Sequence, residues 1–277
     1  MLPSLLILVL IVIAPIAMSF YFSFTDFSIL GSPEWEGTAN YERMLHDPAF
    51  LAALRTTVIY TVLSVPLQTM LSLLIADLFA KRFRTRWGGI ARSALFIPVI
   101  SSLVIVGTVW RFILGTDGGL VNSALEMFGI SSVNFLGNPT LALLAVALVT
   151  VWKNIGYFLV IYYAGIMEVP AELYEASAID GASGWRQLWN ITIPTLRPVT
   201  FLVVILGTIW SFQVFDLVYV MTGGGPGGAT ITLVMAIYQA GFKNLDMGYA
   251  SAMAMVLFVI VLVIAIVQRR MLNRHES

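Results

Sequence analysis

Two long apolar stretches of the sequence contain seven polar or aromatic residues whose side chains could take part in binding or catalysis. They occur in "TVWKNIGYF" and "IWSFQVFDLVYV" and are Lys153, Asn154, Tyr157, Trp210, Gln213, Asp216 and Tyr219. Ammonium, amide and carboxylate groups hydrogen-bond to hydroxyls, and aromatic faces cover the apolar side of a ring. No nucleophile–base constellation accompanies them, so catalysis is not indicated. The set predicts non-covalent binding of a hydroxyl-rich solute such as a sugar.

The composition of the chain requires a membrane around these residues. Hydrophobic residues make up 59% of the 277, charged residues make up 11%, and the mean hydropathy is +0.90. A soluble protein of this size could not bury so much apolar surface. The formal net charge is zero, so no overall basic field would attract nucleic acid. There is no cysteine, and His46 and His275 lie far apart, so no metal site is predicted.

About six segments are long enough to span a bilayer, since a spanning helix needs roughly 20 mainly apolar residues. The first has no basic residue before it and exceeds the roughly 7–15 apolar residues of a signal peptide, so we interpret it as a true span whose cytoplasmic leader is missing or very short. No short repeat appears, and one domain over residues 1–277 is the simplest division. The predicted spans are Leu2–Phe24, Leu51–Ala80, Ile90–Leu114, Thr140–Met167, Val199–Met221 and Gly248–Gln268.

Lysine and arginine predict which side of the membrane each loop faces. The stretch from Lys81 to Arg92 holds five basic residues and no acid, and the C-terminal tail adds three arginines. The stretch from Thr25 to Phe50 instead holds five acids against one arginine. Because basic loops stay in the cytoplasm, both termini and residues 168–198 are predicted to be cytoplasmic.

Residues 168–198, called the bracket segment below, have the features of a short helix-turn-helix. Pro170 suits the first turn of a helix, Asp180-Gly181 ends that helix, and Ser183 could cap a second one. Two interpretations stay open. The segment could lie in the lipid headgroups, anchored by its tryptophans, or it could dock a partner protein. On the second helix, three apolar residues are predicted to share a face: Trp185, Leu188 and Trp189.

The spacing within the bracket segment resembles the EAA loop of bacterial ABC importer permeases, which reads E-A-A-x(3)-G-x(9)-I-x-L-P. Here Glu175-Ala176-Ser177, Gly181 and Ile191-Thr192-Ile193-Pro194 occupy the matching positions, with Ser177 and Ile193 as small departures. The wider stretch "VPAELYEASAIDGASGWRQLWNITIPTLRP", together with "FDLVYVMTGGGPGGAT" and "AIYQAGF", resembles the carbohydrate-uptake branch, which includes maltose and glycerol-3-phosphate permeases. The likeness covers most of the chain. It implies an all-α integral membrane protein of about six transmembrane helices with a cytoplasmic coupling helix-turn-helix.

The resemblance also implies roles for three groups of residues. Solute contacts would lie near mid-depth on the fourth and fifth spans, the two spans that carry the seven residues named first. An outer glycine-rich loop would face the solute-binding protein, although a flexible hinge is the simpler interpretation: Gly223, Gly224, Gly225 and Pro226. The bracket segment would be the coupling helix that fits a cleft of the ATPase subunit, through Glu175, Ala176, Ser177, Asp180, Gly181, Ile191 and Pro194.

Several partners follow from the same resemblance. They are a second homologous permease, two cytoplasmic ATPase subunits and an extracytoplasmic solute-binding protein, in the bacterial cytoplasmic membrane. The chain has no G-x-x-x-x-G-K-[ST] motif, and "GGGPGG" lacks the lysine that would meet phosphate. ATP and Mg²⁺ are therefore expected on the ATPase subunits, and this chain is expected to be neither an enzyme nor a cofactor carrier.

The expected function is a permease subunit of an ATP-driven, binding-protein-dependent importer for a sugar or related polyol. Glycerol-3-phosphate or a glycerophosphodiester is an alternative solute, because an anionic phosphate would give mid-span Lys153 a partner. An ion-gradient-driven secondary transporter is the alternative from another class, and it should show interrupted helices or acidic relays at mid-membrane. A membrane enzyme comes third.

Simpler roles for the span residues also stay open. A charge within a bilayer costs about 2.5–3.5 kcal/mol on insertion scales, so Lys153 must reach a cavity, the membrane surface or a backbone carbonyl. Gln213 and Asp216 could hydrogen-bond to neighbouring helices. At about 1.5 Å per residue, Lys153 lies roughly 20 Å from the outer edge and Asp216 only a few ångström. No direct ion pair between Lys153 and Asp216 is therefore predicted.

Overall fold

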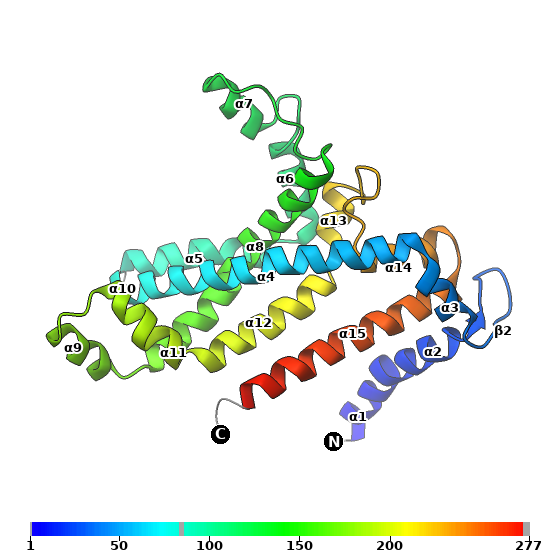
Figure 1. Cartoon of the computed structure of the whole chain (residues 1–277), viewed down its shortest axis with the longest axis horizontal. Coiled ribbons are helices and arrows are strands. Elements are labelled where there is room, and N and C mark those ends of the chain that lie inside the picture. The colour runs from blue at the N-terminus through cyan, green and yellow to red at the C-terminus, as the bar shows by residue number, and fades with distance from the viewer. Residues whose placement is uncertain (1, 83–85, 274–277) are drawn as a thin grey trace.

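The computed structural model is built almost entirely of helices and describes residues 2–82 and 86–273 (Figure 1). In this part of the chain, four helical segments are long and apolar enough to cross a bilayer, or six if each of two bent helix pairs forms one span. The predicted all-α membrane fold is confirmed. Arg84 and Arg274, two of the arginines used to predict the orientation, lie outside the described residues. The four segments are Leu5–Phe22, Pro48–Lys81, Pro139–Glu168 and Met247–Arg270.

The first span lies at the edge of the bundle. It runs through α1 (Leu2–Leu8), the wider π-type turn η1 (Val9–Ile13) and α2 (Ala14–Phe22). No residue of its apolar stretch is buried, and α2 packs against α15 (Met247–Asn273). A helix that is apolar all round needs lipid or protein around it, so this span is suited to a membrane-facing position.

The longest helix, α4 (Pro48–Arg82), is the centre of the bundle. Its 35 residues pack mainly against α8 (Pro139–Glu168) and also against α12 (Arg197–Phe212). The Gln68 side-chain oxygen accepts a hydrogen bond from Asn154 Nδ2 of α8 at 3.1 Å, and Gly207 of α12 leaves room for the Gln68 amide. Buried polar side chains on α4 recur every four residues and so share one face: Tyr60, Ser64, Gln68 and Ser72.

Two predicted spans are interrupted rather than continuous. The third consists of α5 (Arg86–Ile100) and α6 (Leu103–Ile113), which are bent by 104°. The fifth consists of α12 and, after a three-residue break, α13 (Asp216–Met221). The prediction of one continuous helix over Val199–Met221 is therefore wrong. A distant side chain satisfies a carbonyl freed at each break, because Lys153 Nζ donates to Val99 O at 3.3 Å and Thr232 Oγ1 donates to Val214 O at 2.9 Å.

The bracket segment forms the predicted helix-turn-helix at one end of the long axis. Its elements are α9 (Ala171–Ile179), α10 (Gly184–Gln187), η2 (Leu188–Thr192) and α11 (Ile193–Thr195). The second helical part then meets α12 at a bend of 73°. The chain thus passes directly from the bracket segment into the fifth span.

Short elements cap the opposite end of the bundle. They include the antiparallel pair β1 (Thr25–Asp26) and β2 (Glu34–Trp35), and the helical segments α3 (Ala39–His46), α14 (Leu233–Tyr238) and η3 (Gln239–Lys243). An ion pair of 2.7 Å joins Arg43 of α3 to Asp246 before α15. Together with α6, α7 (Leu120–Met127) projects away from the bundle (Figure 1).

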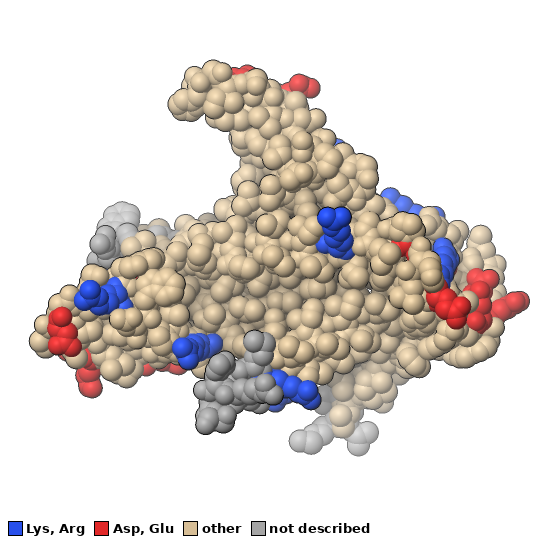
Figure 2. All heavy atoms as spheres, in the orientation of Figure 1, with Lys and Arg blue, Asp and Glu red and all other residues tan. Residues whose placement is uncertain are grey.

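Charged side chains are distributed as expected for a protein that crosses a membrane. Figure 2 shows acidic side chains gathered at the two ends of the long axis and at the tip of the projecting α7, whereas the surface between them is almost free of acids. On α4, Arg55 is exposed close to the end that begins at Pro48, and Asp77 and Lys81 lie near the other end. The uncharged part of α4 between them is the part suited to the hydrocarbon of the bilayer.

Candidate functional site

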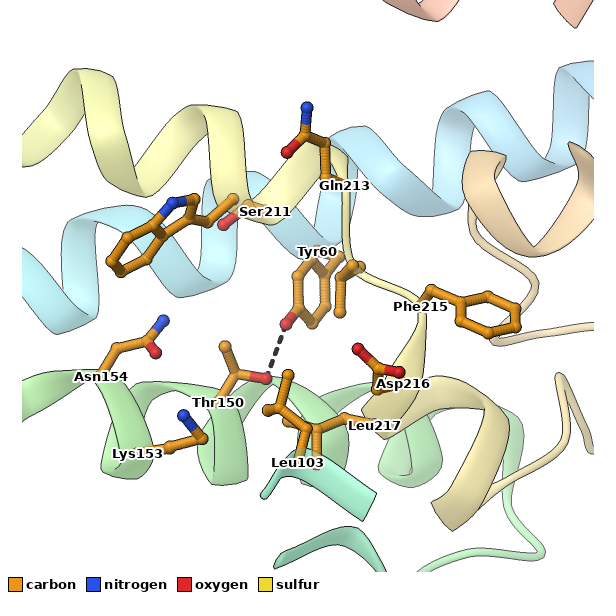
Figure 3. A pocket seen from close by; sticks show the side chains of 12 residues that line it. Tyr60, Leu103, Thr150, Lys153, Asn154, Ser211, Gln213, Phe215, Asp216 and Leu217 are labelled. Carbon is orange, nitrogen blue, oxygen red and sulfur yellow. Dashed lines mark hydrogen bonds between the residues drawn. The ribbon is translucent and has the colours of Figure 1, made fainter. Parts of the chain in front are cut away.

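Five of the seven residues predicted to contact solute line one cavity of about 340 Å³ beside the break between α12 and α13. In Figure 3, Lys153, Asn154 and Thr150 project from α8, and Asp216 faces them from the start of α13. The Gln213 side chain extends from the break on the side away from α8, at the rim of the cavity. The five lining residues are Lys153, Asn154, Trp210, Gln213 and Asp216.

The other two predicted residues lie behind this lining. Tyr157 packs against Trp210, with ring centroids 4.9 Å apart. Tyr219 stacks on Phe215 at 5.3 Å. Both tyrosines therefore touch aromatic rings that line the cavity, and neither is itself part of its wall. The prediction of their direct contact with solute is not supported by their position.

Lys153 and Asp216 share the cavity without forming an ion pair. Among the described residues, the ammonium of Lys153 donates to the carbonyl of Val99 at the end of α5, and no carboxylate lies within ion-pair distance of it. The absence of a direct pair agrees with the prediction, but the argument from depth does not hold. The break at residues 213–215 brings the start of α13 against α8, so both residues line one cavity.

Sequence reasoning missed the wall that α4 contributes. The Tyr60 hydroxyl is fully buried and donates to Thr150 Oγ1 on α8 at 2.6 Å (Figure 3). Thr150 in turn donates to the carbonyl of Val146 within its own helix. The four-residue spacing of polar side chains on α4 was the available signal, because it predicts one polar face on that helix. The further lining residues are Tyr60, Leu103, Thr150, Ser211, Val214, Phe215 and Leu217.

The turn of the bracket segment has the geometry that its sequence predicts. Gly181 adopts a φ of +74°, a left-handed conformation that glycine tolerates best. Ser183 caps α10 by accepting a hydrogen bond from the amide of Arg186. Gln187 ties the two helices together, because its Nε2 donates to Tyr174 O at 3.1 Å and to Ser177 Oγ at 2.9 Å.

The outer surface of the bracket segment is apolar and open. Trp185 and Trp189 form an edge-to-face pair at 6.0 Å and are 63% and 54% exposed. Leu188 is buried, so the prediction that it shares their face is wrong: it turns towards the chain's own helices. On α9, Ile179 is 88% exposed. Of the predicted coupling residues, Ser177 and Ile191 are half-buried, and those exposed are Glu175, Ala176, Asp180, Gly181 and Pro194.

The glycine-rich loop after α13 has a defined shape. Thr230 is fully buried, its hydroxyl lies 2.7 Å from that of Thr222, and it bonds to the carbonyl of Gly225 at 2.8 Å. Side-chain contacts of this kind argue against the simpler interpretation of a flexible hinge. Four glycines of the loop have a positive φ, a conformation that residues with a side chain rarely adopt: Gly223, Gly224, Gly227 and Gly228.

These features together define the membrane-spanning component of a transport system. The chain belongs to the family described as the binding-protein-dependent transport system inner membrane component, whose model matches residues 45–275. Interrupted helices were the feature expected of a gradient-driven secondary transporter, and they occur here. Since this chain belongs to the binding-protein-dependent family, the interruptions do not distinguish the two classes.

Similar proteins include permeases for different solutes. The trehalose/maltose transport system permease protein MalF of Thermococcus litoralis is 35% identical over 96% of this chain and 90% of its own length. The sn-glycerol-3-phosphate transport system permease protein UgpA of Agrobacterium fabrum is 32% identical over 99% of this chain and 93% of its own length.

Solved structures share the fold. A chain from a bacterial ABC transporter involved in the import of the acidic polysaccharide alginate superimposes with a TM-score of 0.89, at 22% identity, over 99% of this chain and 93% of that chain. The alginate transporter in complex with an alginate pentasaccharide-bound periplasmic protein gives a TM-score of 0.86, at 22% identity, over 99% and 92%. The overall arrangement of helices is thus that of a known ABC importer.

Proposed function

We propose that this chain is one permease subunit of an ATP-driven importer and that its solute is a sugar or a related neutral polyol. The observation that carries the proposal is the cavity at the break between α12 and α13. Amide, hydroxyl, ammonium and carboxylate groups converge there beside the indole of Trp210. This combination can hydrogen-bond to hydroxyls and cover the apolar face of a sugar ring. The permease names of the relatives support a solute of this kind.

The charges of the cavity favour a neutral solute over a phosphate ester. An anionic solute would face the carboxylate of Asp216, which lines the same cavity. Lys153 already donates to a backbone carbonyl, so it does not require an anion as its partner. A glycerol phosphate remains the alternative, because Lys153 is still part of the cavity wall and a relative is named for that solute.

The proposed partners meet the chain at its two ends. The bracket segment would dock on one of two ATPase subunits that bind ATP and Mg²⁺, and its exposed apolar surface supports this role. The glycine-rich loop would meet a solute-binding protein on the opposite side. A second, homologous permease would complete the translocation path. In this proposal both termini face the cytoplasm of a bacterial cell, and hydrolysis takes place in the partner subunits.

Reconstitution tests the proposed function. The chain is assembled in proteoliposomes with the proposed second permease, ATPase subunits and binding protein, and uptake of labelled sugars and of glycerol-3-phosphate is measured with and without ATP. ATP-dependent uptake of a sugar or polyol, with hydrolysis stimulated by the loaded binding protein, is expected. Preferential uptake of glycerol-3-phosphate would contradict the neutral solute, and uptake driven by an ion gradient without ATP would contradict the whole proposal.

A further inference from the structure

An ion pair lies at the end of α4 that is next to the bracket segment. Asp77 Oδ1 and Lys81 Nζ are 2.8 Å apart and one helical turn from each other, and Asp77 is only 8% exposed. A carboxylate so deeply buried needs hydrogen-bond partners besides one lysine, because each oxygen can accept more than one bond. Its further partner comes from the bracket segment.

Polar contacts connect this ion pair to three elements of the bracket segment. Thr192 of η2, which is fully buried, donates to Asp77 Oδ1 at 3.4 Å, and the Tyr174 hydroxyl of α9 lies 3.0 Å from Thr192 Oγ1. Lys81 Nζ donates to the carbonyl of Gly184 in α10 at 3.3 Å and lies 5.7 Å from the centre of the Tyr174 ring. Burial raises the pKa of Tyr174, so its hydroxyl stays neutral and able to donate.

Next to these contacts, the bracket segment stands apart from the spans. A cavity of about 540 Å³ lies between the ends of α4 and α8 and the helix α9, and both Lys81 and Tyr174 are part of its wall. Apolar packing therefore does not fill this part of the junction. The polar contacts of Asp77 and Lys81 hold the bracket segment to α4 at the edge of the cavity.

From this junction to the solute cavity α4 is one helix, with Pro66 inside it. Tyr60 lies 17 positions before Asp77, about 25 Å away along the helix at about 1.5 Å per residue. Tyr60 lines the solute cavity and bonds to Thr150 of α8. A displacement of one end of α4 would therefore reach the cavity wall at the other.

We propose that Asp77 and Lys81 are positioning residues that fasten the bracket segment to α4, so that movement of the bracket segment is transmitted through α4 to Tyr60 in the solute cavity. This inference rests on the proposed function, in which an ATPase subunit moves the bracket segment. A pair that served only α4 itself would stabilise the helix and leave coupling unchanged.

The test uses the complete transporter with Asp77→Asn, which keeps the size of the side chain and removes its charge. The subunit composition, the basal ATPase rate, the stimulation of hydrolysis by loaded binding protein and the solute imported per ATP are measured. We expect normal composition and a loss of stimulation of about tenfold, the size of effect for one lost charge-assisted hydrogen bond. Gln268→Leu is the matched control, because it removes a hydrogen bond from Gln268 Nε2 to Thr208 away from the bracket segment.

A distance measurement separates coupling from stability. The chain has no cysteine, so spin labels can be placed at Val62→Cys on α4 and Val259→Cys on α15, both of which are exposed in this chain. The distance between the two labels should change when the parent complex binds ATP. The Asp77→Asn complex should bind ATP as tightly as the parent, but the distance between its labels should stay the same. If Asp77→Asn does not assemble, Thr192→Val provides the same test, because it removes the hydrogen bond from the bracket segment to Asp77 and leaves the ion pair intact.

The outcomes discriminate between the inference and the function on which it rests. A parent complex whose hydrolysis does not respond to loaded binding protein would overturn both. A parent that responds, together with an Asp77→Asn or Thr192→Val complex that keeps full stimulation and the full distance change, would overturn the inference alone. Loss of coupling in Gln268→Leu to the same extent would also overturn it, since the effect would then not be specific to the junction.

Discussion

Lys153 illustrates how a charge in an apolar helix is accommodated by a segment distant in sequence. Its ammonium reaches the carbonyl of Val99 at the end of α5, where the helix stops and its last carbonyls lack helical donors. A cation is also favourable there because a helix carries partial negative charge at its C-terminal end. The simplest of the roles considered for Lys153, contact with a backbone carbonyl, is thus realised, and it coexists with a place in the cavity wall.

Replacing Lys153 by methionine should lower the stability of the assembled protein. The substitution retains most of the side-chain volume but leaves the Val99 carbonyl without this donor, at a cost of about 1–3 kcal/mol. Thermal unfolding followed by tryptophan fluorescence would show a lower midpoint than the parent. Lys243→Met, at an exposed lysine of η3, is the control and should leave the midpoint unchanged. Equal midpoints for all three proteins would show that the contact is not stabilising.

Replacing Asp216 by asparagine should weaken solute handling by a neutral-polyol importer. A carboxylate accepts stronger hydrogen bonds from hydroxyls than an amide does, with a difference of about 1 kcal/mol or more. The solute concentration for half-maximal uptake should rise several-fold while the basal ATPase rate and subunit composition stay constant. Asp117→Asn, at an exposed carboxylate outside the cavity, provides the comparison. An unchanged half-maximal concentration in Asp216→Asn would show that the carboxylate does not contact the solute.

At the scale of elements, the turn of the bracket segment depends on the backbone of one glycine. A Cβ at Gly181 would meet no atom within 4 Å, so there is space for a side chain there. The positive φ is what matters, because a β-branched residue is strained in that conformation. The glycine is therefore needed for the conformation of the turn and not to avoid a steric clash.

Gly181→Val should uncouple the ATPase from the spans. The valine would strain the backbone by about 1–3 kcal/mol. This strain can be relieved only if the turn changes shape, which changes the orientation of α9 relative to α10. Hydrolysis stimulated by loaded binding protein should fall while the basal rate persists. Gly184→Val is the matched control, since a side chain there also meets open space and its φ is not positive. A Gly181→Val complex that retains full stimulated hydrolysis and uptake would contradict the coupling role, and would agree with a bracket merely anchored in the headgroups.

Sequence reasoning reached the elements whose causes are local. The apolar runs were enough to predict the spans. Pro170, Gly181 and Ser183 were enough to predict the bracket segment, because capping and left-handed turns depend on a few neighbouring residues. The break before α13 could not be predicted in this way. The carbonyl of Val214 finds its donor on Thr232, eighteen positions away, so a helix that looks continuous locally is interrupted by tertiary contacts. The α4 wall of the cavity was missed for a related reason, since Tyr60 meets Thr150 only after the bundle has formed.

At the scale of the whole molecule, much apolar surface is left for partners and lipid. No residue of Leu5–Phe22 in the first span is buried, and the bracket segment presents exposed apolar side chains. Large exposed apolar surfaces mark interfaces with protein or membrane. These surfaces therefore need lipid or protein partners to cover them.

We expect the chain to purify as a stable, homogeneous species only with a second permease and two ATPase subunits. Size-exclusion chromatography with light scattering would measure the mass of the complex in detergent and of the chain expressed alone. The chain alone should aggregate, because the surfaces that face its partners would be open to solvent. A homogeneous monomer that transports solute in liposomes without ATP would contradict this expectation and the proposed function.

The length of α4 makes the bilayer itself a component of the mechanism. Its uncharged stretch from Thr56 to Ala76 spans about 30 Å at about 1.5 Å per residue, close to the roughly 30 Å thickness of the hydrocarbon. Arg55 and the Asp77–Lys81 pair therefore fix the depth of α4, and a thicker membrane would draw one of them into hydrocarbon. Mismatch of this kind costs fractions of a kcal/mol per ångström. Uptake per ATP should pass through a maximum as the acyl chains of reconstituted phosphatidylcholine are lengthened, and a flat profile would show that α4 tilts freely.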